Sequence, residues 1–122
     1  MSRPGWVEYW FQMADLVATR ATCPRRAVGA VAVRGNRLIA TGYNGAPAGE
    51  PHCTDVGCDL YVGTDSLEHC GRVLHAEENL VSTAARFGIS LEGADVYVNF
   101  PVCGPCSRRL TQAGVAKVWD IR

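Results

Sequence analysis

Residues 95–106 read DVYVNFPVCGPC, and this stretch decides how the rest of the chain is interpreted. Residues 95–100 alternate in hydrophobicity and carry β-branched and aromatic side chains, which predicts a strand. Cys103 and Cys106 follow at the start of a stretch, 104–113, with the composition of a helix. A strand that leads into two cysteines at a helix start predicts an α/β fold with its chemistry at the helix N-terminus.

The flanking sequence extends this pattern on both sides. Apolar residues three and four apart predict a helix over 4–21. Two strands are predicted over 28–33 and 38–43, on either side of the tight turn 34–37. A second helix is predicted over 74–87. A last strand is predicted over 115–121. Residues 44–72 show no sustained periodicity, so we expect an irregular loop that something must hold in place. The order α-β-β-α-β-α-β predicts a mixed sheet covered by helices.

Size and composition favour one folded unit. A chain of 122 residues that is 48% hydrophobic and has no linker or repeat is expected to form a single domain, 1–122. Lys plus Arg and Asp plus Glu are balanced at 12 each, which disfavours a nucleic-acid polymer as partner. No signal-peptide pattern or membrane-spanning apolar run is seen, so we expect a cytoplasmic protein without a membrane partner.

A second motif complements the two cysteines. His75 and Glu77 stand at the start of the predicted helix 74–87, so one imidazole and the sulfurs of Cys103 and Cys106 can converge where two helices begin. Three protein ligands are typical of a catalytic zinc, because the fourth position stays open for water. Glu77 lies close enough to move a proton without itself being a ligand. In a chain without a signal peptide, metal binding is also favoured over disulfides.

Each motif alone has a simpler interpretation. A lone His-x-Glu is usually coincidental, and a lone Cys-x-x-Cys is also found in redox pairs of the thioredoxin type. Together, in this order, they match the H-x-E and P-C-x-x-C signature of zinc nucleobase deaminases. Pro101 stands one residue earlier than the proline of that signature, whereas the spacing of the cysteines is kept.

Beyond the metal motif, the chain resembles the deoxycytidylate (dCMP) deaminase branch of the cytidine deaminase superfamily. The resemblance is carried by residues 21–30 (ATCPRRAVGA), 41–47 (TGYNGAP), 52–53 (HC), 69–70 (HC) and 75–79 (HAEEN). It implies a three-layer α/β/α fold with a central mixed sheet, a homo-oligomer that is often a hexamer, and hydrolysis of dCMP to dUMP and ammonia. The stretch 42–45 (GYNG) in particular points to a nucleotide substrate.

The resemblance also assigns substrate contacts. It implies that Asn44 contacts the sugar 3′-hydroxyl, with an asparagine that only shapes a turn as the alternative. Arg25 and Arg26 would bind the 5′-phosphate, although exposed arginines commonly face only solvent. We also count Ala76, between His75 and Glu77, among the candidate substrate contacts.

In this family, the loop that here contains Gly42, Tyr43 and Gly45 can also bind dCTP as an activator or dTTP as an inhibitor. Those three residues are therefore candidate effector contacts.

A second, structural zinc site is expected from the remaining cysteines, since some family members carry one. The candidate ligands are Cys23, Cys53, Cys58 and Cys70, with His52 and His69 beside two of them. Such a site would hold the long loop 44–72. Buried cysteines that serve only as small apolar side chains are the alternative.

The resemblance leaves the substrate partly open. Relatives usually continue past the last strand, whereas this chain stops at residues 119–122, which would widen the pocket to a 5-methyl or 5-hydroxymethyl cytosine. The other candidates are a nucleoside or free-base deaminase, an adenosine deaminase acting on tRNA, and a non-catalytic zinc scaffold that binds dNTPs. Neutral charge disfavours tRNA, residues 42–45 disfavour a free base, and Glu77 disfavours the scaffold.

Overall fold

The structure is a computed structural model that describes residues 2–120. Its centre is a four-stranded mixed sheet with the strand order β2-β1-β5-β6. Strand β1 (Gly29–Arg34) pairs antiparallel with β2 (Arg37–Tyr43) and β5 (Asp95–Val98), and β5 pairs parallel with β6 (Lys117–Trp119).

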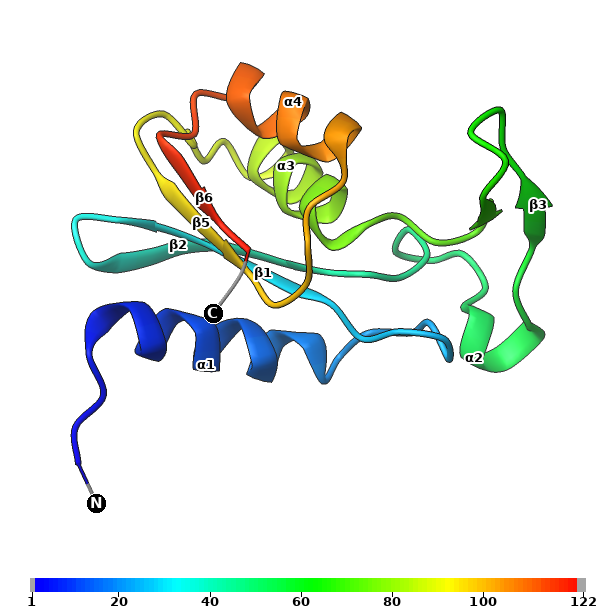
Figure 1. Cartoon of the computed structure of the whole chain (residues 1–122), viewed down its shortest axis with the longest axis horizontal. Helices are drawn as coiled ribbons and strands as arrows, with labels where there is room; N and C mark the ends of the chain where they lie inside the picture. The colour runs from blue at the N-terminus through cyan, green and yellow to red at the C-terminus, as the bar shows by residue number, and fades with distance from the viewer. Residues whose placement is uncertain (1, 121–122) are drawn as a thin grey trace.

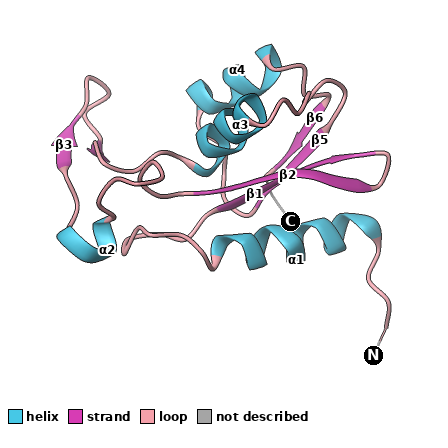
Figure 2. Cartoon of the chain, turned by 180° about the vertical axis from the view of Figure 1, so that it is seen from behind, coloured by secondary structure: helices cyan, strands magenta, loops and turns pink. Residues whose placement is uncertain are grey.

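Helices cover both faces of this sheet (Figures 1 and 2). Helix α1 (Trp6–Ala18) packs on one face, and α3 (Ala76–Arg86) and α4 (Gly104–Gln112) pack on the other. The predicted three-layer α/β/α fold with a mixed sheet is confirmed.

Two apolar cores follow from the strand sequences. Successive side chains of a strand point to opposite faces, so the nearly continuous apolar runs of β1 and β5 need cover on both sides. On the α1 face, Val31 and Tyr97 pack with Trp10 and Phe11. On the other face, the core includes Ala30, Ala32, Val96 and Val98 of the strands with Leu80 of α3 and Leu110 of α4.

The turn between β1 and β2 has the geometry that its sequence predicts. Gly35 and Asn36 both have positive φ, 59° and 56°. Positive φ at both central residues is the type I′ arrangement, whose twist matches that of paired strands.

Gly42 lets α3 lie unusually close to β2. A Cβ atom at Gly42 would lie 2.5 Å from the backbone nitrogen of Leu80 and would also meet the carbonyl oxygen of Ala76. Only glycine leaves room for this approach. The N-terminal turn of α3 is therefore held directly against the end of β2.

The segment 44–72 differs from its prediction. It contains α2 (Cys53–Val56) and a separate antiparallel hairpin of β3 (Leu60–Val62) and β4 (Glu68–Cys70), which projects beyond the end of the sheet (Figure 1). The prediction of an irregular loop was wrong here, because elements of three or four residues are too short to show a period.

The other predicted elements are present with shifted ends. The helix predicted over 4–21 spans Trp6–Ala18, and the helix predicted over 74–87 begins at Ala76. The last strand covers Lys117–Trp119, and the predicted end of it, residue 121, lies outside the described residues. Within residues 2–120, every helix is too short or too polar to cross a bilayer.

Candidate active site and metal centre

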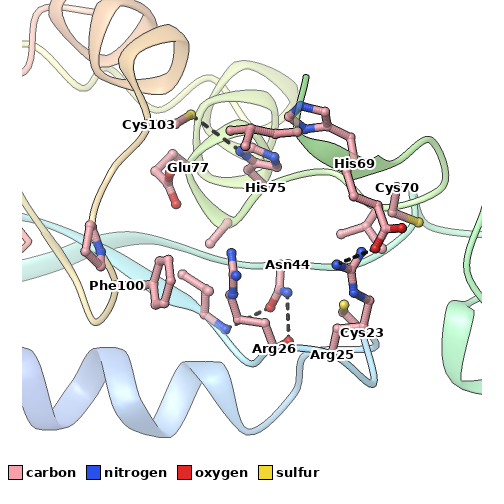
Figure 3. A pocket seen from close by; sticks show the side chains of 16 residues that line it. Cys23, Arg25, Arg26, Asn44, His69, Cys70, His75, Glu77, Phe100 and Cys103 are labelled. Carbon is pink, nitrogen blue, oxygen red and sulfur yellow. Dashed lines mark hydrogen bonds and ion pairs between the residues drawn. The ribbon is translucent and has the colours of Figure 1, made fainter. Parts of the chain in front are cut away.

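Helices α3 and α4 begin side by side and bring the predicted catalytic ligands together. His75 is the N-cap of α3, Cys103 is the N-cap of α4, and Cys106 lies in the first turn of α4. The Nδ1 atom of His75 lies 3.6 Å from Sγ of Cys103 (Figure 3) and 3.4 Å from Sγ of Cys106.

These separations fit a tetrahedral zinc ion. Zinc binds sulfur at about 2.3 Å and nitrogen at about 2.0–2.1 Å, which at a tetrahedral angle places the two donor atoms ~3.6 Å apart. A carboxylate oxygen of Glu77 completes the cluster, and the four donor atoms lie within 4.8 Å of one another. The donor set of one imidazole and two sulfurs therefore fits zinc, with a carboxyl group within reach of the open position.

The carboxyl of Glu77 is in a dry environment. The residue is only 5% exposed, and desolvation raises the pKa of its carboxyl above the usual value, although its hydrogen bond to Cys106 acts in the opposite direction. A carboxyl whose pKa is raised holds a proton more readily, which suits a group that must accept and return one.

Burial also governs Cys106. Desolvation, followed by the nearby Cys103 and Glu77, raises the pKa of its thiol. A thiolate at such a site needs a compensating cation, because burying an isolated charge is costly.

Three polar side chains that the sequence analysis missed hold these helix starts. Glu78 accepts a hydrogen bond from the backbone N–H of His75 at 2.9 Å, and Asn79 donates to the carbonyl of Tyr43 at 2.6 Å. Asp120 accepts from the backbone N–H of Val102 at 2.9 Å, just before Cys103. Glu78 and Asn79 lie in the stretch 75–79 that carries the resemblance, and Glu78 also has the signal of a glutamate three residues after an N-cap, whereas Asp120 had no signal.

A cavity of about 450 Å³ opens beside the metal ligands. Its walls come from residues 23–28, the end of β2, the hairpin residues 67–70, the start of α3 and residues 100–103 (Figure 3). This volume lies within the usual range for small-molecule sites. Glu68 and Phe100 line it and were not singled out from the sequence, where neither belongs to a motif.

Asn44 lies in the wall of this cavity but uses its amide to shape the chain. Its Oδ1 accepts a hydrogen bond from the backbone N–H of Val28 at 2.9 Å, and its Nδ2 donates to the carbonyl of Arg26 at 2.9 Å (Figure 3). This is the structural role that the sequence left as the alternative. One N–H and one lone pair of the amide remain for a ligand.

The two arginines lie at the rim of the cavity. Arg25 forms an ion pair with Glu68, with Nη2 and Oε1 3.1 Å apart. The guanidinium of Arg26 lies 4.3 Å from the centre of the Phe100 ring. Both cations therefore face the cavity from the same segment.

The remaining substrate and effector candidates are largely buried. Ala76 lines the cavity and is 1% exposed. Gly42 and Gly45 are buried, Tyr43 is half-buried, and Gly45 exchanges two backbone hydrogen bonds with Leu74. The two glycines thus pack the loop against the start of α3.

Three of the four cysteines predicted for a second site gather at α2 and the hairpin. The sulfur atoms of Cys53, Cys58 and Cys70 lie within 4.8 Å of one another, and those of Cys53 and Cys70 are 3.7 Å apart. Two sulfurs on one tetrahedral zinc are ~3.8 Å apart. The sulfur of Cys23 is not within 4.8 Å of all three.

The two histidines near this cluster have different surroundings. His69 places Nε2 between the carboxylate oxygens of Asp65, at 2.9 and 2.8 Å. The Nδ1 atom of His52 is buried and has no hydrogen-bond partner among residues 2–120.

Comparison with known proteins agrees with this geometry. Residues 4–120 match the family model of the cytidine and deoxycytidylate deaminase zinc-binding region. ComE operon protein 2 of Bacillus subtilis is 42% identical over 98% of this chain and 60% of its own length. Deoxycytidylate deaminase of Schizosaccharomyces pombe is 42% identical over 95% of this chain and 37% of its own length, so the chain spans less than two thirds of these curated relatives.

A solved structure is similar throughout. The dCMP deaminase of cyanophage S-TIM5, in complex with dCMP and dUMP, is 32% identical, with a TM-score of 0.78 over 97% of this chain and 82% of that one. Because the family model matches nearly the whole chain and the solved structure shares its fold, this chain belongs to the cytidine and deoxycytidylate deaminase family.

Proposed function

We propose that this chain is a zinc-dependent deaminase that hydrolyses dCMP, so that dCMP and water give dUMP and ammonia. The observation that carries the proposal is the convergence of His75, Cys103 and Cys106 with the buried Glu77 at one cavity. Relatives that are named deoxycytidylate deaminases, and a similar enzyme solved with dCMP and dUMP, support the choice of substrate.

His75, Cys103 and Cys106 would hold the catalytic zinc. When bound, that ion acts as a Lewis acid that makes water a nucleophile at neutral pH. The position of Glu77 beside the three ligands suits proton transfer. Its carboxyl accepts a proton from the water that attacks C4 of the cytosine, delivers one to N3, and assists the departure of the C4 amino group as ammonia.

The other walls of the cavity would bind the rest of the nucleotide. Ala76, at the start of α3, lies where the base must approach Glu77. Arg25 and Arg26 supply guanidinium groups for the 5′-phosphate. Asn44 shapes their segment and keeps an N–H and a lone pair for the sugar 3′-hydroxyl.

A second zinc would be held by Cys53, Cys58 and Cys70. Desolvation, followed by Cys70 and Cys58, raises the pKa of Cys53 to about 12, so a cation is needed to stabilise its thiolate. The backbone N–H of Asp59 points at Sγ of Cys70 at 3.4 Å, as expected for a ligand sulfur. Cys23 and His52 are the candidates for the fourth position.

Further properties belong to the same proposal. We expect residues 1–122 to act as one catalytic domain in the cytoplasm, and the chain to form a homo-oligomer, with a hexamer as one form. Exposed apolar side chains on the hairpin, such as Tyr61 and Val62, support self-association. dCTP and dTTP remain candidate effectors at Tyr43.

Ammonia release from zinc-loaded protein tests the proposed reaction. The substrates are dCMP, CMP, deoxycytidine, cytosine, and 5-methyl and 5-hydroxymethyl dCMP. Turnover of dCMP at a higher kcat/KM than deoxycytidine supports the proposal. Preference for deoxycytidine or cytosine, or no turnover of any cytosine compound by the zinc-loaded protein, contradicts it.

A further inference from the structure

The β3–β4 hairpin places a carboxylate against one of the two arginines at the cavity. Glu68 is the first residue of β4, and its Oε1 lies 3.1 Å from Nη2 of Arg25. Both residues line the cavity, and their side chains are 54% and 43% exposed. An ion pair this exposed is worth little to folding, so an anionic ligand can compete for the same guanidinium.

The other charged groups at the rim are arranged differently. Arg26 lies over the Phe100 ring, and among residues 2–120 no carboxylate is within ion-pair distance of it. His69, on the same hairpin as Glu68, is paired with Asp65. Of the two arginines, Arg25 is therefore the one that is already paired with a carboxylate of the protein.

We infer that Glu68 is a specificity-determining residue that competes with the 5′-phosphate for Arg25. The inference rests on the proposed function, because it concerns the phosphate of the same substrate. A phosphate monoester carries a charge of about −1.5 to −2 at pH 7. It must displace the carboxylate of Glu68 or share Arg25 with it, and either outcome weakens the binding of a phosphorylated substrate.

A substrate without phosphate does not meet this competition. Glu68 therefore lowers the advantage of a nucleotide over the matching nucleoside. Removing the charge of Glu68 should favour the nucleotide selectively, which a general loss of structure would not do.

Steady-state kinetics on zinc-loaded enzyme test the inference. In Glu68→Gln, the ratio of the KM for deoxycytidine to the KM for dCMP is expected to rise about threefold to tenfold. The control Glu50→Gln removes the same charge from an exposed residue outside the cavity lining, and it should keep the wild-type ratio. An unchanged or lower ratio in Glu68→Gln, or an equal rise in Glu50→Gln, overturns the inference.

A double-mutant cycle tests whether Arg25 mediates the effect. Arg25→Gln is expected to raise the KM for dCMP, and the addition of Glu68→Gln to that variant should change the KM less than it does in the wild type. Equal changes in the two backgrounds would show that Glu68 does not act through Arg25.

A binding measurement separates the inference from the proposed reaction. If the wild-type protein deaminates no cytosine compound, the proposed function fails, but the competition at Arg25 can still be measured by calorimetry with inorganic phosphate. Tighter phosphate binding by Glu68→Gln than by the wild type and Glu50→Gln then supports the inference. Equal or weaker binding contradicts it.

Discussion

The side chain of Asn44 is bound on both sides by the backbone of the segment that carries the two arginines. Its Oδ1 accepts a hydrogen bond from the N–H of Val28 at 2.9 Å, and its Nδ2 donates to the carbonyl of Arg26 at 2.9 Å. Asn44 itself is 6% exposed. One buried amide thus fixes the geometry of a cavity wall.

Replacement of Asn44 should weaken both the fold and the site. Asn44→Ala leaves the buried N–H of Val28 without its partner, which is expected to lower the free energy of unfolding by about 1–3 kcal/mol. Urea denaturation measures this, with the exposed substitution Gln112→Ala as the control. A variant as stable as the control would show that Asn44 does not hold the segment.

A substitution of Gly42 should also destabilise the protein, because α3 packs closely against this residue. Gly42→Ala places a Cβ atom 2.5 Å from the backbone nitrogen of Leu80, so α3 must move away from β2. We expect a loss of about 1–3 kcal/mol in stability and a lower kcat, because α3 carries His75 and Glu77. Gly104→Ala, whose Cβ meets nothing within 4 Å, is the matched control for stability. Equal stability of the two variants would contradict the packing argument.

Removal of one cysteine should abolish zinc binding at the proposed second site and leave the proposed catalytic site intact. If the proposed second zinc is bound, Cys58→Ser is expected to lower the zinc content from two ions per chain to one and to lower the Tm, because a proposed ligand between α2 and β3 is lost. Turnover should persist, since the proposed catalytic ligands lie at the starts of α3 and α4. Metal analysis and thermal unfolding are the measurements. Two zinc ions retained in Cys58→Ser would exclude it as a ligand.

Alkaline pH should destabilise the α1 face of the sheet through Tyr97. Desolvation, followed by Asp95, raises the pKa of its phenol above 10.0. Between that value and the raised folded-state pKa, the unfolded chain loses a proton that the folded chain keeps, so stability falls as pH rises. Tyr97→Phe should reduce this slope in denaturation experiments above pH 10. An identical slope would assign the effect to another group.

Much of this architecture could be predicted from the sequence. The apolar spacing of the first helix, the runs of apolar and β-branched residues at 29–34 and 95–98, and the polar turn 34–37 are local signals, and each produced the expected element. The convergence of the candidate ligands His75, Cys103 and Cys106 could also be expected, because each was predicted to lie at the start of a helix.

Contacts between distant segments could not be predicted from the sequence. The hairpin of β3 and β4 is too short to show a period, and the ion pair of Arg25 with Glu68 joins residues 43 positions apart by numbering that no motif connects. The role of Asn44 was left between two alternatives, since an amide can bind either a ligand or the backbone. Only the fold places Val28 and Arg26 beside it.

The central claim is that Glu77 transfers protons and is not a metal ligand. Its most direct test is the rate of ammonia release from dCMP by Glu77→Gln, with the zinc content of the same samples measured. The account predicts full zinc content and a rate about 10²- to 10⁴-fold below the wild type. Turnover within tenfold of the wild type at full zinc content, or activity lost only together with the metal, would contradict it.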